Sequence, residues 1–390
     1  MKKLNVGMIG AGFAARLHSD SIKRIAGLDI DLVSVAATKL ESAKQIANIY
    51  GYYKYTDNYK EVLQDTDIDV VILATPPSTH LIMTTEAMEA GKHVICEKPL
   101  TGYFGMPNDK KPIGIKVSKE KMYNKVLADI KKLRNTIKNS NQKFMYAENY
   151  IYSPNIQKAA EIINKKKSTI LFMKGEESVQ GSPSSFASSW EDTGGGTLLR
   201  IGCHPLGGII YLKNIEAKTK GIDIKVKSVV ADIGTIATTL TSEQRKYLRA
   251  NPLDVEDFGT MTITFTDNTK ATIFANDNVL GGVKNYIEIY TNDSSLICNI
   301  TPTDELKTYF IDQEDLEDVY ISEKLENKTG WNKVFVSESI KRGYVNQMQD
   351  FLECVAYGKQ PISSFEIAAE TTKILYAAYV SASEGRRVYL

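Results

Sequence analysis

The chain has 390 residues and a formal net charge of +1, from 48 Lys and Arg against 47 Asp and Glu. This is more residues than one hydrophobic core ordinarily accommodates, so we expect two domains. Hydrophobic residues make up 43% and charged residues 24% of the chain, as is typical of soluble globular proteins. Without a long block of one charge sign, nucleic acid and anionic membrane surfaces are disfavoured as main partners. No apolar run approaches the ~18 residues of a membrane span, and we expect a cytoplasmic protein.

The cysteines and histidines show no metal-binding spacing. The four cysteines form no CxxC pair, and no two of the four histidines are four residues apart. We therefore expect neither a disulfide framework nor a metal site. These residues are Cys96, Cys203, Cys298, Cys354, His18, His80, His93 and His204.

A dinucleotide fingerprint stands near the start of the chain. The apolar run 4–9 leads into the sequence GAGFAA at 10–15, the GxGxxA form of the motif. Gly10 permits the tight turn, and Gly12 lets the backbone approach a pyrophosphate. Because a helical pattern follows a strand pattern here, the motif is stronger evidence than it would be alone. We expect Phe13 and Ala14, at the start of this helix, to contact the cofactor.

The end of the second strand leaves the choice of cofactor open. A strand is predicted over 31–37, and an NAD site normally has an acidic residue at this end for the ribose hydroxyls. Here the strand ends Ala37-Thr38-Lys39. Without a carboxylate a 2′-phosphate would not be repelled, and Lys39 could attract it. The cofactor is therefore NAD or NADP, with Thr38 and Lys39 near the ribose.

Two further apolar strands end in polar loops. The strand 69–74 runs into Thr75-Pro76, and Thr79 is predicted to cap a helix that ends at Gly91. The strand 93–96 runs into Glu97-Lys98-Pro99. The alternation of strands and helices predicts a doubly wound parallel sheet. Ligands bind at the carboxyl ends of such strands, and we expect Thr75, Pro76, His80, Glu97 and Lys98 there.

The pattern changes after residue 149. A long Gly-, Pro- and Lys-containing loop at 101–117, a helix over 119–138 and a strand over 143–148 precede this point. Beyond it, strands are predicted at 169–177, 229–236, 261–265, 271–275, 286–290 and 296–300. Turn residues separate many of them, which favours a mostly antiparallel sheet. We expect a Rossmann domain over 1–149 and an α+β domain over 150–390, whose C-terminal helix 365–384 packs back on the first domain.

The sequence resembles the glucose-fructose oxidoreductase / inositol dehydrogenase / rhizopine-catabolism (Gfo/Idh/MocA) family over essentially its whole length. The matching motifs are GAGFAA at 10–15, ATPPSTH at 74–80, AGKHVICEKPL at 90–100, GGG at 194–196, GCH at 202–204, VEDF at 255–258, DFLECVAYGKQP at 350–361 and SEGRRVYL at 383–390.

The resemblance implies NAD(P)-dependent oxidation or reduction of a sugar, glycoside or cyclitol hydroxyl. It also implies that Lys98 contacts the substrate near the reacting carbon and that His204 exchanges the hydroxyl proton. The chemistry is sound, because hydride leaves carbon only as the hydroxyl proton is removed and His is a suitable base near neutral pH. A lysine cation beside it would stabilise the developing alkoxide.

The sequence departs from the family pattern around His204. Arg200 stands where the family often has Asp, and Gly207 replaces an Asp three residues after the histidine. A carboxylate partner for His204 must then come from Glu148, Glu176 or Glu177. Arg200 could pair with a buried Glu or bind an anionic group of the substrate.

Further substrate contacts are predicted at Glu148, Asn149, Tyr152 and Glu176. Other functions remain open, namely paired glycosidase carboxylates among these glutamates, redox-assisted glycoside cleavage by transient hydroxyl oxidation, and a non-catalytic dinucleotide-sensing regulator. One face of the second sheet needs cover, and we expect a homodimer or homotetramer built through it.

Overall fold

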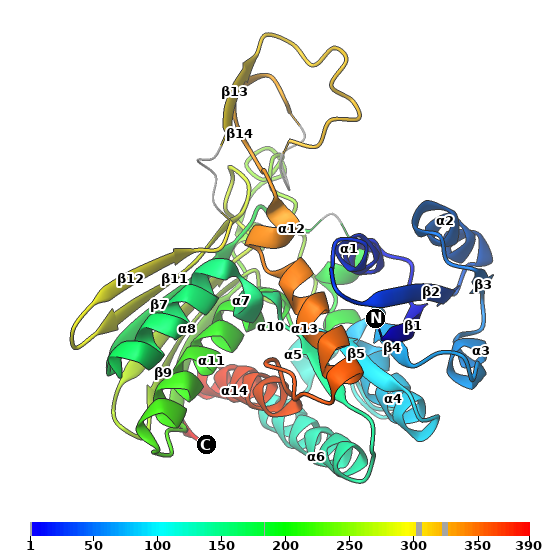
Figure 1. The fold of residues 1–390 in the computed structure, drawn as a ribbon. Coiled ribbons are helices and arrows are strands. Elements are labelled where there is room, and N and C mark those ends of the chain that lie inside the picture. The colour runs from blue at the N-terminus through cyan, green and yellow to red at the C-terminus, as the bar shows by residue number, and fades with distance from the viewer. Residues whose placement is uncertain (1, 183, 302–305, 322–326) are drawn as a thin grey trace.

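The computed structural model describes residues 2–182, 184–301, 306–321 and 327–390. Two β-sheets organise these residues, one in each half of the chain (Figure 1). No helix in the described ranges combines the length and the hydropathy needed to cross a membrane.

The first sheet has six strands in the order β3-β2-β1-β4-β5-β6, and all neighbours are parallel. The central strand β4 and the edge strand β6 are buried along their whole length, as expected of strands covered by helices on both faces. The strands are β1 (Lys3–Ile9), β2 (Asp29–Ala36), β3 (Lys54–Thr56), β4 (Val70–Leu73), β5 (His93–Glu97) and β6 (Phe144–Ala147). The helices are α1 (Phe13–Ile22), α2 (Leu40–Tyr50), α3 (Tyr59–Gln64), α4 (Pro77–Glu89), α5 (Ile113–Lys116) and α6 (Lys119–Lys138).

The second sheet has seven strands in the order β12-β11-β7-β10-β9-β8-β15. All neighbours are antiparallel except β7 and β10, which run parallel. The strands are β7 (Ile170–Ser178), β8 (Val226–Gly234), β9 (Phe258–Phe265), β10 (Lys270–Asn276), β11 (Lys284–Thr291), β12 (Ser295–Asn299) and β15 (Val388–Tyr389). The predicted combination of a parallel Rossmann sheet with a mostly antiparallel second sheet is confirmed.

Helices cover one face of the second sheet (Figure 1). Gly175 of β7 lets Pro205 and Ile209 of α11 approach, because a Cβ on it would lie 2.7 Å from the Pro205 side chain. The helices of this half are α7 (Asn149–Tyr152), α8 (Pro154–Lys166), α9 (Trp190–Thr193), α10 (Thr197–Arg200), α11 (Cys203–Lys220), α12 (Glu338–Lys341), α13 (Tyr344–Tyr357) and α14 (Phe365–Glu384). Short 3-10 helices are η1 (Ser185–Ser188) and η2 (Ala237–Thr239).

The last long helix, α14, joins the two halves. It contacts α6 and β6 of the first half and β8 of the second. Arg134 of α6 forms a two-pronged ion pair with Glu366, at 2.8 and 3.1 Å, and Phe144 of β6 packs edge-on against Phe365. The start of α14 is therefore fixed to the Rossmann half by charge and by aromatic packing.

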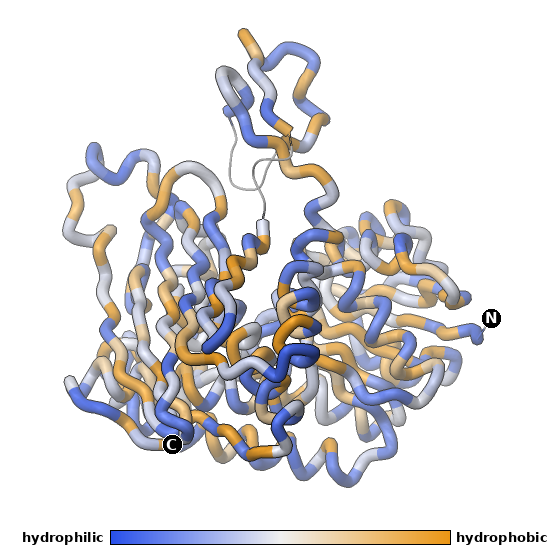
Figure 2. The backbone as a smooth tube through the Cα atoms, turned by 60° about the vertical axis from the view of Figure 1, so that its left-hand side comes forward, coloured by the Kyte–Doolittle hydropathy of each residue, from blue (hydrophilic) through white to orange (hydrophobic). Residues whose placement is uncertain are grey.

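A two-stranded arm stands away from the body of the molecule in both views (Figures 1 and 2). It consists of β13 (Leu306–Phe310) and β14 (Gly330–Val334), which pair antiparallel. Tyr309 and Trp331 contact each other across the strands with ring centroids 5.5 Å apart, and both are more than half exposed. The sequence pattern did not indicate these strands.

One local prediction is wrong. Thr79 does not cap α4, because the helix begins at Pro77 and Thr79 lies inside its first turn. The Thr79 hydroxyl instead donates to the Pro76 carbonyl at 2.8 Å and contacts the Thr75 hydroxyl at 2.7 Å. The proline at the first helical position has no backbone N–H that would need a cap.

Candidate active site

A cavity of about 410 Å³ lies at the carboxyl ends of β1, β2 and β4. Parallel doubly wound sheets bind ligands at this edge. Seven of the residues predicted to hold a cofactor line it, namely Gly10, Gly12, Phe13, Ala14, Thr38, Thr75 and Pro76. Asp57 and Tyr59 line it as well. Lys39 and His80 are not among the lining residues.

Glycine is suited to the two positions of the fingerprint for different structural reasons. Gly10 has φ +120°, and a Cβ on it would lie 2.2 Å from the Ala74 carbonyl oxygen. Gly12 has no atom within 4 Å of the place a Cβ would take. Because Gly12 lines the cavity and precedes the first helix, that free space fits a pyrophosphate approaching the backbone.

Asp57 places a carboxylate at the lining of this cavity, whereas β2 has none at its carboxyl end. It follows β3 directly, and the Ala37 N–H donates to the Thr56 carbonyl at 3.1 Å, which joins the ends of β2 and β3. The sequence pattern did not indicate Asp57, because the acidic residue of a dinucleotide site usually ends the second strand. Thr38 and Asp57 therefore line the same cavity from the ends of two neighbouring strands.

A second cavity, of about 360 Å³, shares Phe13, Ala14 and Thr75 with the first. Glu97 and Lys98 line it from the end of β5. Arg342 lines it just before α13, and Tyr344 lines it as the first residue of α13. The other polar lining residues are Asn149, Glu177, Arg200 and His204. We call it the reaction cavity. It brings Lys98 and His204 together, although 106 residues separate them.

Hydrogen bonds hold the Glu97-Lys98-Pro99 turn. Glu97 accepts from the Lys98 N–H at 2.9 Å and contacts His18 Nε2 at 2.7 Å. Burial acts to raise the pKa of Glu97, but the His18 hydrogen bond and the Lys98 charge outweigh it and lower that pKa. His80 is buried between the Pro99 and Thr75 carbonyls, at 2.8 and 3.0 Å, and burial lowers its pKa. His18 and His80 thus position the loops around Lys98.

The Lys98 ammonium donates to the Arg200 carbonyl at 2.8 Å. An ammonium has three donors, so this bond fixes the side chain and leaves two for a ligand in the reaction cavity.

Glu148 is the carboxylate partner of His204. Its Oε1 lies 2.7 Å from His204 Nδ1 and also accepts from the Tyr150 N–H at 3.2 Å. His204 is further held by Tyr150, whose ring stacks on the imidazole at 5.1 Å. No hydrogen bond from a described residue reaches Nε2, the nitrogen left to act on a ligand.

Gly207 makes the Glu148–His204 contact possible. A Cβ at residue 207 would lie 2.9 Å from Glu148 Cγ and 3.3 Å from Glu148 Cδ. The absence of an acidic side chain at residue 207 therefore leaves the space in which a carboxylate from another element reaches the histidine.

The surroundings shift the proton affinities of this pair strongly. Burial raises the pKa of Glu148 well above its ordinary value, against the opposing charge of Lys98. Burial, followed by the charges of Lys98 and Arg342, lowers the pKa of His204 well below its ordinary value. An unprotonated imidazole is thus favoured near neutral pH, and buried groups with such shifts mark candidate functional sites.

Glu177 and Arg342 complete the polar wall of the reaction cavity. Glu177 accepts from the Tyr150 hydroxyl at 2.6 Å, and its other oxygen lies 3.9 Å from Arg342. Arg342 also binds Glu338 at 3.0 Å. No sequence motif indicated Arg342, because it reaches the site only through the packing of α12 and α13.

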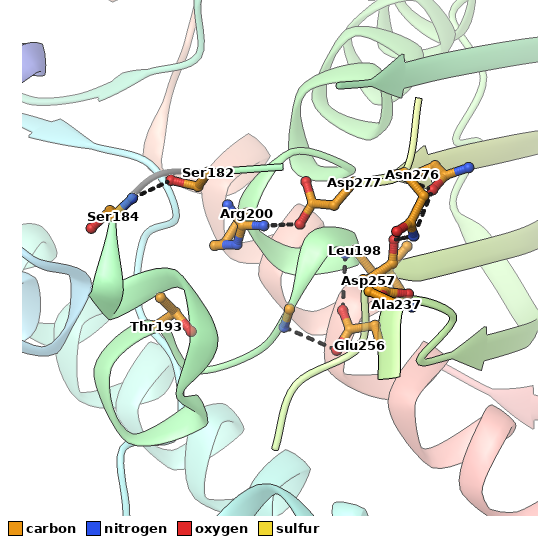
Figure 3. A network of polar contacts seen from close by, with 12 residues as sticks. Ser182, Ser184, Thr193, Leu198, Arg200, Ala237, Glu256, Asp257, Asn276 and Asp277 are labelled. Atoms are coloured by element: carbon orange, nitrogen blue, oxygen red, sulfur yellow. Dashed lines mark hydrogen bonds and ion pairs between the residues drawn. The ribbon is translucent and has the colours of Figure 1, made fainter. Parts of the chain in front are cut away.

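Arg200 pairs with Asp277 rather than with a glutamate (Figure 3). Both side chains are largely buried, at 17% and 5% exposure. Asp277 lies 77 residues further along the chain, so sequence spacing could not identify it.

The predicted substrate residues separate into two groups. Asn149, Arg200 and, through its bond to His204, Glu148 lie at the reaction cavity. Tyr152 does not line it; its hydroxyl binds Asp350 at 2.7 Å and accepts from the Ser363 N–H. Glu176 points to the opposite face of the sheet, where it binds Lys284 at 2.9 Å. The side chains of Tyr152 and Glu176 therefore have their polar contacts outside the reaction cavity.

Among the described residues, Glu148, Cys203 and His204 form one group with potential metal-ligand atoms within 4.8 Å. The carboxyl and the imidazole are hydrogen-bonded to each other, and burial raises the pKa of Cys203, which disfavours a thiolate. The donor set is engaged internally and does not fit a cation.

Two family models match the chain. Residues 4–107 match the oxidoreductase family with an NAD-binding Rossmann fold, and residues 169–390 match the C-terminal α/β domain of the same Gfo/Idh/MocA oxidoreductases. The chain belongs to this family.

The chain is similar to relatives that are named as dehydrogenases. A levoglucosan dehydrogenase of Pseudarthrobacter phenanthrenivorans is 27% identical over 337 residues, which cover 81% of this chain and 78% of the relative. An inositol 2-dehydrogenase of Saccharopolyspora erythraea is 42% identical over 102 residues, covering 26% of this chain and 29% of the relative.

Solved Gfo/Idh/MocA structures share the fold. GenD2 from gentamicin A biosynthesis, in complex with NAD, has a TM-score of 0.79 at 20% identity and covers 100% of this chain and 97% of its own. Levoglucosan dehydrogenase with NADH and L-sorbose has a TM-score of 0.72 at 23% identity and covers 100% and 99%. The chain is thus an NAD-binding oxidoreductase of this family.

Proposed function

We propose that the protein is an NAD-dependent dehydrogenase acting on a secondary hydroxyl of a sugar, glycoside or cyclitol. The observation that carries this proposal is the reaction cavity itself, where Lys98 and His204 meet beside the dinucleotide cavity. The named relatives act on levoglucosan and inositol, which supports a polyhydroxylated substrate.

The proton chemistry follows from the contacts of His204. With Glu148 ionised, Nδ1–H donates to its Oε1, and Nε2 is free to take the hydroxyl proton. Lys98 donates to the same hydroxyl oxygen and stabilises negative charge that develops there. NAD held in the dinucleotide cavity would supply the acceptor for the hydride that leaves the substrate carbon.

The same assignment gives a pH dependence. Glu148 and His204 titrate as a pair, and the pair must lose one proton before Nε2 can act as a base. Activity in the oxidation direction therefore rises with pH through the apparent pKa of the pair.

The proposed preference for NAD rests on Asp57. Asp57 lines the dinucleotide cavity together with Thr38, and its carboxylate would bind ribose hydroxyls there and repel a 2′-phosphate. Lys39 lies outside the lining and is exposed, so it offers little compensation.

The function is tested with the His204→Ala variant. Single-turnover absorbance at the nicotinamide band, over a panel of sugars and cyclitols, measures hydride transfer directly. We expect a loss of about 10²- to 10⁴-fold, the usual contribution of a positioned base, with NADH affinity unchanged. Hydride transfer at the parent rate in the variant contradicts the proposal.

Two other outcomes identify the alternatives. Release of an aglycone without net NADH formation indicates redox-assisted glycoside cleavage. Tight NADH binding without hydride transfer to any sugar by the parent protein indicates a dinucleotide-sensing regulator.

We further propose self-association through the face of the second sheet opposite α11, which no helix of the described residues covers. Phe172, Phe274, Tyr286 and Tyr290 are half-buried on the face opposite α11, and Phe172 stacks on Tyr290 at 6.2 Å. Burying such a face in a symmetric dimer or tetramer would remove apolar surface from water. A monomer mass by light scattering at micromolar concentration contradicts this assembly.

A further inference from the structure

A third cavity, of about 390 Å³, lies next to the reaction cavity. The two cavities share Ser182 and Arg200 as lining residues. We call the third cavity the distal cavity. Its polar lining includes Ser184, Ser188, Arg249 and Asn251, and its volume falls within the range of small-molecule sites.

Arg200 forms the boundary between the two cavities. Its carbonyl accepts from the Lys98 ammonium, while its guanidinium binds Asp277 on the distal side (Figure 3). One residue therefore contacts the lysine of the reaction cavity through its backbone and lines the distal cavity with its side chain.

The loops around the distal cavity are tied to one another. The Arg249 N–H donates to the Gln180 carbonyl at 2.8 Å, and the Leu253 N–H donates to the Ser188 carbonyl at 2.9 Å. Asp254 accepts from the Gly114 N–H at 2.9 Å and from the Trp190 N–H at 2.7 Å. The loop 249–254 is thus tied by hydrogen bonds to the segment 180–188 and to the helices α5 and α9.

Two carboxylates of the distal cavity are held by hydrogen bonds from the protein. Glu256 accepts from the Gly196 and Leu198 N–H groups, both at 2.9 Å, and from the Tyr379 hydroxyl at 2.8 Å. Asp257 accepts from the Ile236 and Ala237 N–H groups at 2.7 and 2.8 Å.

The remaining lining favours an uncharged ligand. The two arginines of the cavity face three carboxylates, those of Glu256, Asp257 and Asp277, so there is no excess of positive charge for an anion. The serine hydroxyls and the Asn251 amide can both donate and accept. Such groups suit a neutral unit that carries several hydroxyls.

We propose that the substrate is a glycoside of at least two units. The ring that is oxidised lies between Lys98 and His204, and a second, neutral, hydroxyl-rich unit passes Arg200 into the distal cavity. This inference rests on the proposed dehydrogenase function and narrows its substrate class.

The test compares one-unit and two-unit substrates on the full-length protein with NAD. The probes are the methyl glycosides of glucose, galactose and mannose, and the corresponding disaccharides. We expect at least one disaccharide to have a kcat/KM tenfold or more above its methyl glycoside, the factor that one or two net hydrogen bonds contribute. Calorimetric titration of the NADH-bound protein with the same sugars measures the preference without turnover.

Variants locate the second unit. Ala187 lines the distal cavity, so Ala187→Trp fills it and is expected to abolish the disaccharide preference. Asn251→Trp, from the other side of the cavity, checks the same point should the first variant fold poorly. Phe186→Trp is the matched control, because Phe186 is 62% exposed and does not line the cavity.

The outcomes separate this inference from the function on which it rests. Oxidation of methyl glycosides with equal or lower activity on disaccharides overturns the two-unit substrate and leaves the dehydrogenase. A higher kcat/KM for a disaccharide whose second unit is glucuronate or galacturonate than for its neutral counterpart overturns the neutral second unit. An equal loss on one-unit and two-unit substrates in both tryptophan variants overturns the assigned location. Absence of hydride transfer to every sugar removes both proposals.

Discussion

Gly207 offers the sharpest test of how His204 is positioned. In Gly207→Ala the new Cβ would lie 2.9 Å from Glu148 Cγ, closer than carbon atoms pack. Glu148 cannot move freely, because its Oε1 is hydrogen-bonded to His204 Nδ1 and to the Tyr150 N–H. We expect the carboxyl to shift and the 2.7 Å contact with the imidazole to break or lengthen.

The Gly207→Ala variant should lose much more activity than stability. Alanine is favoured over glycine inside a helix by about 1 kcal/mol, and overpacking costs about 1–3 kcal/mol. The variant should therefore lose between about 0 and 2 kcal/mol of unfolding free energy and remain folded. A displaced base can lower turnover about 10²-fold, so the loss of kcat should be much larger than the loss of stability suggests.

Gly208→Ala is the matched control. It lies in the same helix, and its Cβ would meet Ile287 Cδ1 at 2.7 Å but not Glu148. Steady-state kcat with NAD and thermal unfolding are measured for both variants. Equal kcat values in the two variants at similar stability would refute the positioning role assigned to Glu148.

Three further predictions concern the charges and the cofactor. The Lys98 cation lowers the pKa of both Glu148 and His204, so Lys98→Met should raise both pKa values. The acid limb of the kcat/KM profile should then move to higher pH. A limb that stays in place or moves to lower pH argues against this role of Lys98. Gly12→Val should abolish NADH binding in calorimetry with an unchanged melting temperature, because no protein atom lies within 4 Å of the new Cβ; retained affinity would remove the pyrophosphate from this position. Asp57→Ala should reduce the kcat/KM ratio of NAD to NADP, whereas Lys39→Asp at an exposed residue should change it little; the opposite pattern would place the ribose at Lys39.

The strands β1, β4 and β5 of the first sheet were predictable because each is an apolar run that ends in residues typical of a strand end. Apolar runs ending in Gly10, Thr75 and Glu97 predicted buried parallel strands, and their carboxyl ends meet at one edge. Lys98 follows β5 and therefore lies at this edge of the sheet, as its position after a predicted strand indicated. Thr79 was misassigned because the neighbouring proline at the first helical position changes what the helix start requires.

Tertiary partners could not be predicted from the chain. Glu148, Glu176 and Glu177 were equivalent as partners of His204 until the strand and helix geometry separated them. Adjacent residues of β7 point to opposite faces, so Glu177 reaches the cavity wall while Glu176 binds Lys284 on the other side. The pairing of Arg200 with Asp277 and the arrival of Arg342 depend on contacts between distant elements, which no local pattern encodes.

The order in which the site's residues are synthesised has a consequence for the nascent protein. The dinucleotide cavity is lined entirely by residues up to 83, whereas the reaction cavity includes Arg342 and Tyr344. Domains fold in sequence as the chain emerges from the ribosome. A half-made chain could thus hold its cofactor before the reaction cavity is closed, and redox turnover would begin only when the last helices have docked.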